Sequence, residues 1–177
     1  MIKKSISIIA VALTVALFTA TAQDKMVTDD GVMVGGAMMV RSKNIVENAA
    51  NSKDHTALVT AVKASDLAET LSGVGPFTVF APTNEAFNKL PAGTVDELLK
   101  PESKGRLASV LNHHVVAGRY TSEDFKNGMS LKTVDGQSIY ISKKGNTWMV
   151  NNAMIQIADI MDSNGVTFVI DKVLMSK

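Results

Sequence analysis

The sequence contains no cysteine among its 177 residues. This absence excludes disulfide bonds, and it also excludes a lipoprotein, whose lipid is attached to a cysteine at the cleavage point. An exported chain without disulfides must be stabilised by burial of its side chains. A chain of this length is sufficient for that, since a domain of roughly 150 residues buries about 68–70% of its unfolded surface.

Reactive motifs are also missing. The sequence has no G-x-S-x-G elbow and no S-x-x-K motif, so it provides no recognisable serine nucleophile. Gly73 and Gly75 precede a predicted strand instead of opening a helix, and the lysine of a phosphate-binding loop is absent. Adjacent acidic residues such as Glu123 and Asp124 are expected to be solvated. We therefore predict that the protein is not an enzyme and needs no cofactor.

A strong charge of either sign is lacking as well. Lysine and arginine number 18 and acidic residues 17, while 46% of the residues are hydrophobic and 20% are charged. This balance is typical of a globular protein. It provides no electrostatic attraction for nucleic acid, so we predict no nucleic-acid partner.

The first residues are typical of a secretory signal peptide. Lys3 and Lys4 precede the apolar run 6–18, which ends in the small residues Ala20-Thr21-Ala22. This run is too short to span a membrane, so no integral membrane span is expected after cleavage. We predict cleavage of residues 1–22, and a secreted protein in the periplasm or outside the cell. Residues 23–43, rich in glycine and methionine, are predicted to be a flexible tether leading to one domain over 44–177.

Helices are expected in the first half of this domain. Asn44 and Glu47 can cap one helix and Asp54 a second, while Thr94 and Glu97 have the spacing of a capping box. The segment GPFTVFAPTNEAFNKLP, residues 75–91, reads as a strand that ends at Pro82, an N-cap at Thr83 and a short helix.

Strands dominate the second half of the domain. Residues 131–134 and 139–141 alternate around Asp135-Gly136, the commonest hairpin signal, and further strands are predicted over 148–150, 153–157 and 166–170. Because helices precede most of the strands, the order favours an α+β fold with an antiparallel sheet.

The three histidines are the main candidates for chemistry. His114 continues the apolar stripe of the helix over 102–112, so we interpret it as a core histidine bonded to backbone; a catalytic or ligand role is the alternative. His113 points away from that stripe and is expected to be partly exposed. His55 is read as a solvated helix start. Met33, Met38 and Met39 are interpreted as apolar filler instead of soft metal ligands, so no metal site is predicted.

Three segments together resemble the fasciclin (FAS1) domain family. They are GPFTVFAPTNEAFNKLP, LNHHVVAGRY over 111–120 and SNGVTFVIDKVL over 163–174. The resemblance covers about residues 44–176. It implies a wedge of two short antiparallel β-sheets with a cluster of helices alongside, in which the first and last segments are neighbouring strands. The matching signature positions are Phe77, Pro82, Thr83, Asn84, Phe87, Asn164, Gly165 and Asp171.

The resemblance also implies a function in cell adhesion or in binding to a cell-surface or matrix protein or glycan. The family's Tyr-His pair falls on His113 and His114, so the tyrosine is replaced. Its Asp-Ile pair is similar to Asp159 and Ile160, and the histidine common in its last segment is Phe168. We predict partner binding through His113, His114, Asp159 and Ile160, although core packing is the alternative for Ile160.

Two function classes remain open at this point. The first is a non-catalytic secreted binding module, in which an exposed Tyr120, Tyr140 or Trp148 can stack on sugar rings. The second is a periplasmic small-ligand-binding protein or an enzyme with a dispersed site around His114. The oligomeric state is not indicated by the sequence.

Overall fold

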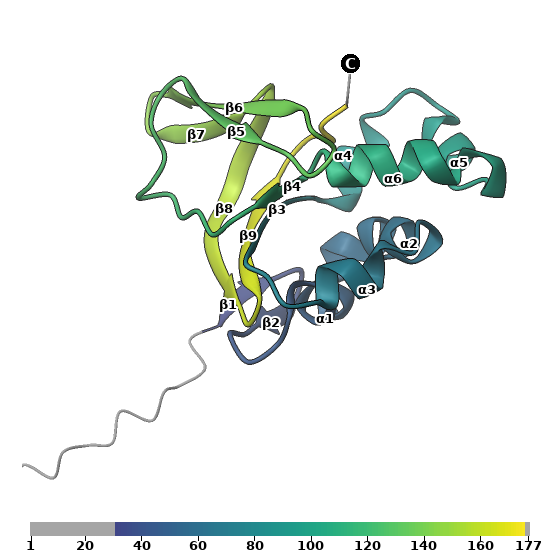
Figure 1. Cartoon of the computed structure of the whole chain (residues 1–177), viewed down its shortest axis with the longest axis horizontal. Helices are drawn as coiled ribbons and strands as arrows, with labels where there is room; N and C mark the ends of the chain where they lie inside the picture. Colours follow the sequence, from purple (N-terminus) through teal and green to yellow (C-terminus); the bar gives the residue numbers. More distant parts are fainter. Residues whose placement is uncertain (1–30, 176–177) are drawn as a thin grey trace, which may run out of the picture.

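A computed structural model describes residues 31–175 of the chain. The helices gather on one side of the molecule and a curved sheet forms the other side, with a small hairpin at the end where the described chain begins (Figure 1). The predicted signal peptide over 1–22 lies outside the described residues. The helices are α1 (Ile45–Asn51), α2 (Thr56–Ala64), α3 (Leu67–Ser72), α4 (Asn84–Asn88), α5 (Thr94–Leu98) and α6 (Lys104–Asn112), with short 3₁₀ turns at Lys53–His55 and Pro101–Ser103.

Nine strands are described. Two of them, β1 (Val32–Val34) and β2 (Ala37–Met39), form the separate hairpin. The other seven lie in the order β4-β3-β9-β8-β7-β6-β5. They are β3 (Phe77–Pro82), β4 (Val115–Ala117), β5 (Met129–Lys132), β6 (Ser138–Lys144), β7 (Thr147–Val150), β8 (Ala153–Asp162) and β9 (Gly165–Ile170).

The α+β class and the wedge architecture are confirmed, with one difference in strand pairing. β3 and β9 are neighbours as expected, but they run parallel, whereas every other pair is antiparallel. At the far ends of the order, a bridge between Val116 and Thr133 brings β4 and the end of β5 together. The sheet therefore curves until it almost closes.

β3 lies between two hydrophobic cores, and β9 contributes Phe168 to the inner one and Val169 to a third cluster. On the inner face, Phe80 stacks on Phe168 with ring centroids 5.4 Å apart, and Phe125 lies 5.0 Å from Phe168. On the other face, Val79 and Ala81 pack against the helices. Both strands are thus covered on two sides, which explains why they read as near-continuous apolar runs instead of alternating ones.

Two of the helix N-caps predicted from the sequence are present in the structure, and two are not. Asn44 and Glu47 form a complete capping box on α1, and Thr83 caps α4. Asp54 does not cap α2, because the amide of Ala57 at its first turn donates to Asn84 Oδ1 at 2.9 Å. Thr94 is the first helical residue of α5 instead of its cap, since Gly93 takes the cap position at φ +86°.

The prediction of a flexible tether over 23–43 is wrong for its described part, residues 31–43. This part contains the β1–β2 hairpin, in which Val34 and Met39 are buried. Both side chains pack against Ile160 on β8 and Val169 on β9, so the hairpin covers an apolar patch on the outer face of the sheet. The glycines of the segment do not indicate flexibility, because Gly35 and Gly36 form the turn of the hairpin at φ +57° and +75°.

Paired methionine substitutions test whether the hairpin is part of the folded unit. Met39 is 2% exposed and its neighbour Met38 is 47% exposed. We expect Met39→Ala to lower the free energy of unfolding by about 2 kcal/mol or more, because it opens a cavity above Ile160 and Val169. Met38→Ala, the matched control, is expected to change it by less than about 0.5 kcal/mol. Urea unfolding measures the free energy of unfolding of both variants. Equally small effects of the two substitutions would support the prediction of a flexible tether.

Candidate functional site

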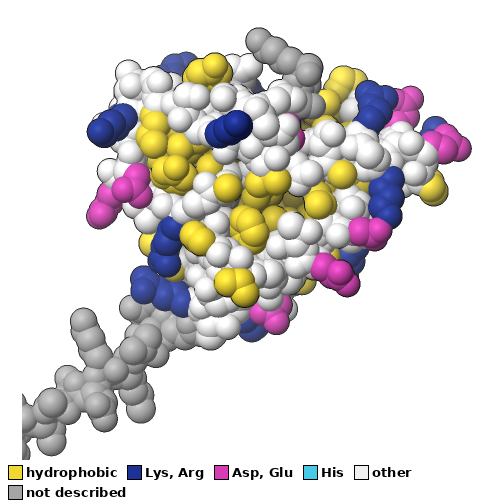
Figure 2. Space-filling model, viewed as in Figure 1, with side chains coloured by type: hydrophobic (Ala, Val, Ile, Leu, Met, Phe, Trp, Pro, Cys, Tyr) yellow, Lys and Arg dark blue, Asp and Glu magenta, His cyan; other side chains and the backbone are white. Residues whose placement is uncertain are grey.

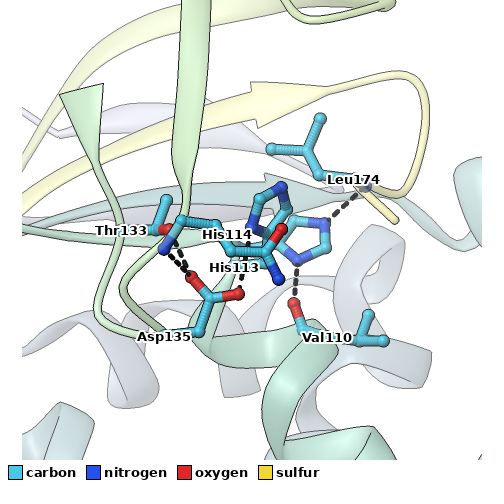
Figure 3. Close-up of polar contacts among 7 residues, drawn as sticks. Val110, His113, His114, Thr133, Asp135 and Leu174 are labelled. Atoms are coloured by element: carbon cyan, nitrogen blue, oxygen red, sulfur yellow. Dashed lines mark hydrogen bonds and ion pairs between the residues drawn. The ribbon is translucent and has the colours of Figure 1, made fainter. Parts of the chain in front are cut away.

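The two neighbouring histidines make different contacts at the junction of α6 and β4 (Figure 3). Nδ1–H of His114 donates to the carbonyl of Val110 at 2.7 Å, and its Nε2 accepts from the amide of Leu174 at 2.8 Å. The ring therefore links the last turn of α6 to the C-terminal segment. The prediction of a core histidine bonded to backbone is confirmed.

The environment of His114 keeps its ring neutral. The side chain is 2% exposed, and burial lowers its pKa to about 4. Both ring nitrogens are occupied in the neutral form, so His114 has no free nitrogen for a ligand or for proton transfer to one.

His113 is buried as well, at 3% exposed, which corrects the prediction of a partly exposed side chain. Its Nδ1–H donates to Asp135 Oδ2 at 3.1 Å, and Asp135 also accepts from the hydroxyl of Thr133 and the amide of Gln137. Although burial opposes it, these hydrogen bonds lower the pKa of the Asp135 carboxyl. The sequence had marked Asp135 only as a turn residue.

His55 is also inside the protein, with no exposed surface, where a solvated position was expected. Its Nδ1 lies 3.0 Å from the hydroxyl of Ser52, and burial lowers its pKa against the charge of Asp54. The turn at residues 53–55 folds the ring beneath the start of α2, a position that spacing alone did not indicate.

Asp159 and Ile160 lie on β8, which β3 and β9 separate from β4 beside the histidines, and the four residues do not form one patch. Ile160 is completely buried, in line with core packing. Asp159 sits at a β-bulge with φ +58°, and its carboxylate accepts from the amide of Ser122 at 2.7 Å and from the hydroxyl of the same residue. His113, His114 and Ile160 therefore offer almost no surface to a macromolecular partner.

A groove that the sequence did not reveal lies beside His113. It has a volume of about 860 Å³ and is bounded by the β5–β6 turn, β6, the β7–β8 turn and the C-terminal segment. Its lining brings together residues up to 62 positions apart, so no local sequence pattern predicts it. The lining residues are His113, Gln137, Ser138, Tyr140, Asn151, Asn152, Ala153, Lys172, Val173, Leu174 and Met175.

The three aromatic residues proposed for sugar stacking differ in their exposure to solvent. Tyr140 is 58% exposed and lines this groove. Tyr120 and Trp148 pack against the inner core, and Trp148 meets Phe125 edge-on at 5.7 Å. Tyr140 is thus the most exposed of the three, since Tyr120 and Trp148 are only partly exposed.

The surface carries no dominant charge on the face shown in Figure 2, where acidic and basic side chains are scattered. Within residues 31–175, no cluster of three or more histidine or acidic side chains is arranged to hold a metal ion. Over the same range, none of the helices has the length and apolar character needed to cross a bilayer.

Comparison with known proteins identifies the family. The model of the fasciclin domain matches residues 53–176. The chain belongs to the fasciclin family. Protein sll1483 of Synechocystis is 44% identical over 148 residues, which cover 84% of this chain and 82% of that protein. Immunogenic protein MPB70 of Mycobacterium bovis is 37% identical over 132 residues, covering 72% of this chain and 66% of its own length.

More distant matches agree with this assignment. Transforming growth factor-beta-induced protein ig-h3 of the rabbit Oryctolagus cuniculus is 39% identical over 117 residues, which span 66% of this chain but 17% of that protein. Among solved structures, a FAS1 domain pair from the insect cell adhesion molecule fasciclin I superimposes with a TM-score of 0.69. That match has 19% identity and covers 77% of this chain and 52% of the other, so it shows the shared fold.

The signature residues of this fasciclin domain have structural roles. Asn164, in the β8–β9 turn, donates to the carbonyls of Leu71 and Gly73 and accepts from the amide of Ile45. Gly165 is required by close packing, because a Cβ there would lie 2.0 Å from the carbonyl oxygen of Phe77.

The remaining signature residues connect neighbouring elements. Asn84 caps α2 from α4 and also donates to the carbonyl of Lys53. Asp171 accepts from the amide of Met154 at 2.7 Å and pairs with Lys89. Pro82 closes β3, and Phe87 and Phe77 pack in the helical core.

Because His114 is neutral in the folded protein, the stability lost on replacing it is expected to depend on pH. Its folded pKa of about 4 lies below the usual value near 6.5, so the unfolded chain binds the extra proton first as the pH falls. His114 therefore loses its contribution to stability between pH 6.5 and 4. We expect His114→Gln to be most destabilising at pH 7, and up to about 3 kcal/mol less so at pH 4.

Urea unfolding at pH 4, 5, 6 and 7 measures this difference. The comparison with the variant is needed because burial raises the pKa of Asp162 to about 6, which changes wild-type stability in the opposite direction between pH 4 and 6. A cost of His114→Gln that does not vary with pH would contradict a neutral ring.

Proposed function

We propose that the protein is a non-catalytic binding module that is exported and recognises a protein or glycan of a cell surface or matrix. Cleavage of residues 1–22 places it in the periplasm or outside the cell. The observation that carries the proposal is the combination of a fasciclin fold with buried histidines whose contacts hold the scaffold together. The fasciclin I domain pair, which shares this fold, comes from a molecule described as a cell adhesion molecule.

The alternative of a ligand site or enzyme centred on His114 has no support from its geometry. Both ring nitrogens of His114 are bonded to backbone, and burial lowers its pKa to about 4. Asp159 is held by Ser122 in the loop between β4 and β5, and Tyr140 faces the solvent. The three residues of that dispersed site do not converge on one pocket.

A capture experiment tests the proposal. The mature chain is immobilised and exposed to surface proteins and glycans from its own source, with unfolded chain as the control for nonspecific adsorption. We expect retention by the folded chain alone, because recognition depends on an assembled surface. Equal capture by folded and unfolded chain, or turnover of a substrate abolished by one substitution that leaves the melting curve unchanged, would contradict it.

A second measurement tests whether His114 stabilises the fold or contacts the partner directly. We expect His114→Ala to lower the melting temperature, since two backbone hydrogen bonds lose their partner. The molecules that remain folded should still be captured, because the ring has 2% of its surface exposed and cannot contact the partner itself. Unchanged melting with lost binding would show that His114 contacts the partner directly.

A further inference from the structure

We propose that the groove around Tyr140 binds an acidic oligosaccharide, that is, a glycan whose sugar rings carry carboxylates. The inference rests on the proposed function and narrows it to one surface and one class of partner. The groove is bounded by the β5–β6 turn, Tyr140 on β6, Asn151 and Asn152 in the β7–β8 turn, and residues 172–175.

The size of the groove suits a short run of sugar rings. Its volume of about 860 Å³ lies within the range of roughly 300–1,000 Å³ found for small-ligand sites. Two turns and the C-terminal segment form its walls, so it is a groove that a chain can enter along its length.

Unused amide groups line this groove. The amide of Asn151 donates to the carbonyl of Tyr140 at 2.8 Å, and Asn151 Oδ1 accepts from the amide of Tyr140 at 2.9 Å. These contacts fix the side chain and leave its Nδ2 hydrogens without a partner among residues 31–175. The side chains of Asn152 and Gln137 form no hydrogen bond with any described residue. Together they present donors and acceptors that match sugar hydroxyls.

His113 adds an oriented acceptor. Asp135 takes the hydrogen of Nδ1, so in the neutral ring Nε2 carries the lone pair. Figure 3 shows Nε2 on the side of the ring away from Asp135, and no described residue bonds to it. This nitrogen is not among the fully enclosed polar atoms that lack a partner, so it reaches solvent through the groove that His113 lines. A sugar hydroxyl can donate to it.

Tyr140 provides a stacking surface. Its neighbours Ile139 and Ile141 are completely buried, which fixes the backbone of β6 while the phenol ring stays 58% exposed. Aromatic rings that are apolar on their faces and polar at one edge suit the mixed surface of a sugar. The backbone that carries the ring is thus held in place, and more than half of the surface of Tyr140 is open to a ligand.

The charge of the groove favours an acidic sugar over a neutral one. Lys172 is exposed and has no ion pair or hydrogen bond with residues 31–175. No aspartate or glutamate is among the lining residues. A carboxylate on the ligand would therefore meet a cation without a competing anion among the lining residues.

A peptide suits this groove less well. Strand addition needs a free sheet edge, but the end strands β4 and β5 meet through the Val116–Thr133 bridge, and the amide of Val134 donates to the carbonyl of Val115 at 2.8 Å. The groove also has a single aromatic side chain, whereas protein interfaces depend on clustered apolar and aromatic anchors.

Titration calorimetry of the exported chain with tetragalacturonic acid tests the proposal, with maltotetraose as the neutral probe. We expect the acidic probe to bind more tightly. Tyr140→Ala should weaken its binding at least about tenfold through lost stacking. Lys172→Met should weaken binding of the acidic probe by a similar factor and leave the neutral probe unchanged. Lys144→Met, an exposed lysine outside the groove, is the matched control.

The outcomes separate this inference from the proposed function. The double variant Tyr140→Ala/Lys172→Met is added to the capture experiment. If it captures surface material as well as the wild-type chain does, and tetragalacturonic acid does not bind, the groove assignment is wrong while the proposed function stands. If the captured material is protein and its capture depends on Tyr140, the glycan assignment is wrong. If the folded chain captures nothing and binds neither sugar, both proposals fail.

Discussion

The parallel pairing of β3 and β9 is the constraint on which the rest of the structure depends. These strands lie 88 positions apart in the chain, and their register runs from Phe77 opposite Gly165 to Pro82 opposite Ile170. Gly75 and Gly165 permit the close approach, because a Cβ at either would lie 2.0 Å from a backbone oxygen of the other segment. Both strands are buried on two faces, with the inner core on one side. On the other side β3 packs against the helices, and β9 packs against Ile160 and the N-terminal hairpin.

The same pair determines where the groove lies. The amide of Phe80 on β3 donates to the carbonyl of His114 at 2.9 Å, which brings the start of β4 beside β3. The ring of His114 then binds the amide of Leu174, and Leu174 lines the groove. A buried histidine thus positions one wall of a surface that its own side chain does not reach. Its neighbour His113, oriented by Asp135, lies at the base of that surface.

The N-terminal hairpin extends the domain beyond the residues that match the family model. That match begins at residue 53, whereas β1 and β2 precede it and cover Ile160 and Val169. The burial of Ile160 therefore depends partly on residues outside the matched range. This explains why an Asp-Ile pair that resembles an adhesive element belongs to the core in this chain.

The sequence by itself determined the local elements and the family. Asn44 with Glu47, Thr83 and the Asp135-Gly136 turn act through neighbours in the chain, so their roles follow from spacing. It also indicated that His114 belongs to the buried stripe of α6.

Only the tertiary structure decided the functions of residues that act across the chain. His113 meets Asp135 at a separation of 22 residues, and Asn84 caps a helix 27 residues earlier. The hairpin over 31–39 was hidden for the same reason, because its buried side chains contact strands more than 100 residues away. Such contacts depend on how the sheet curves and closes, and this curvature cannot be predicted from the periodicity of the sequence.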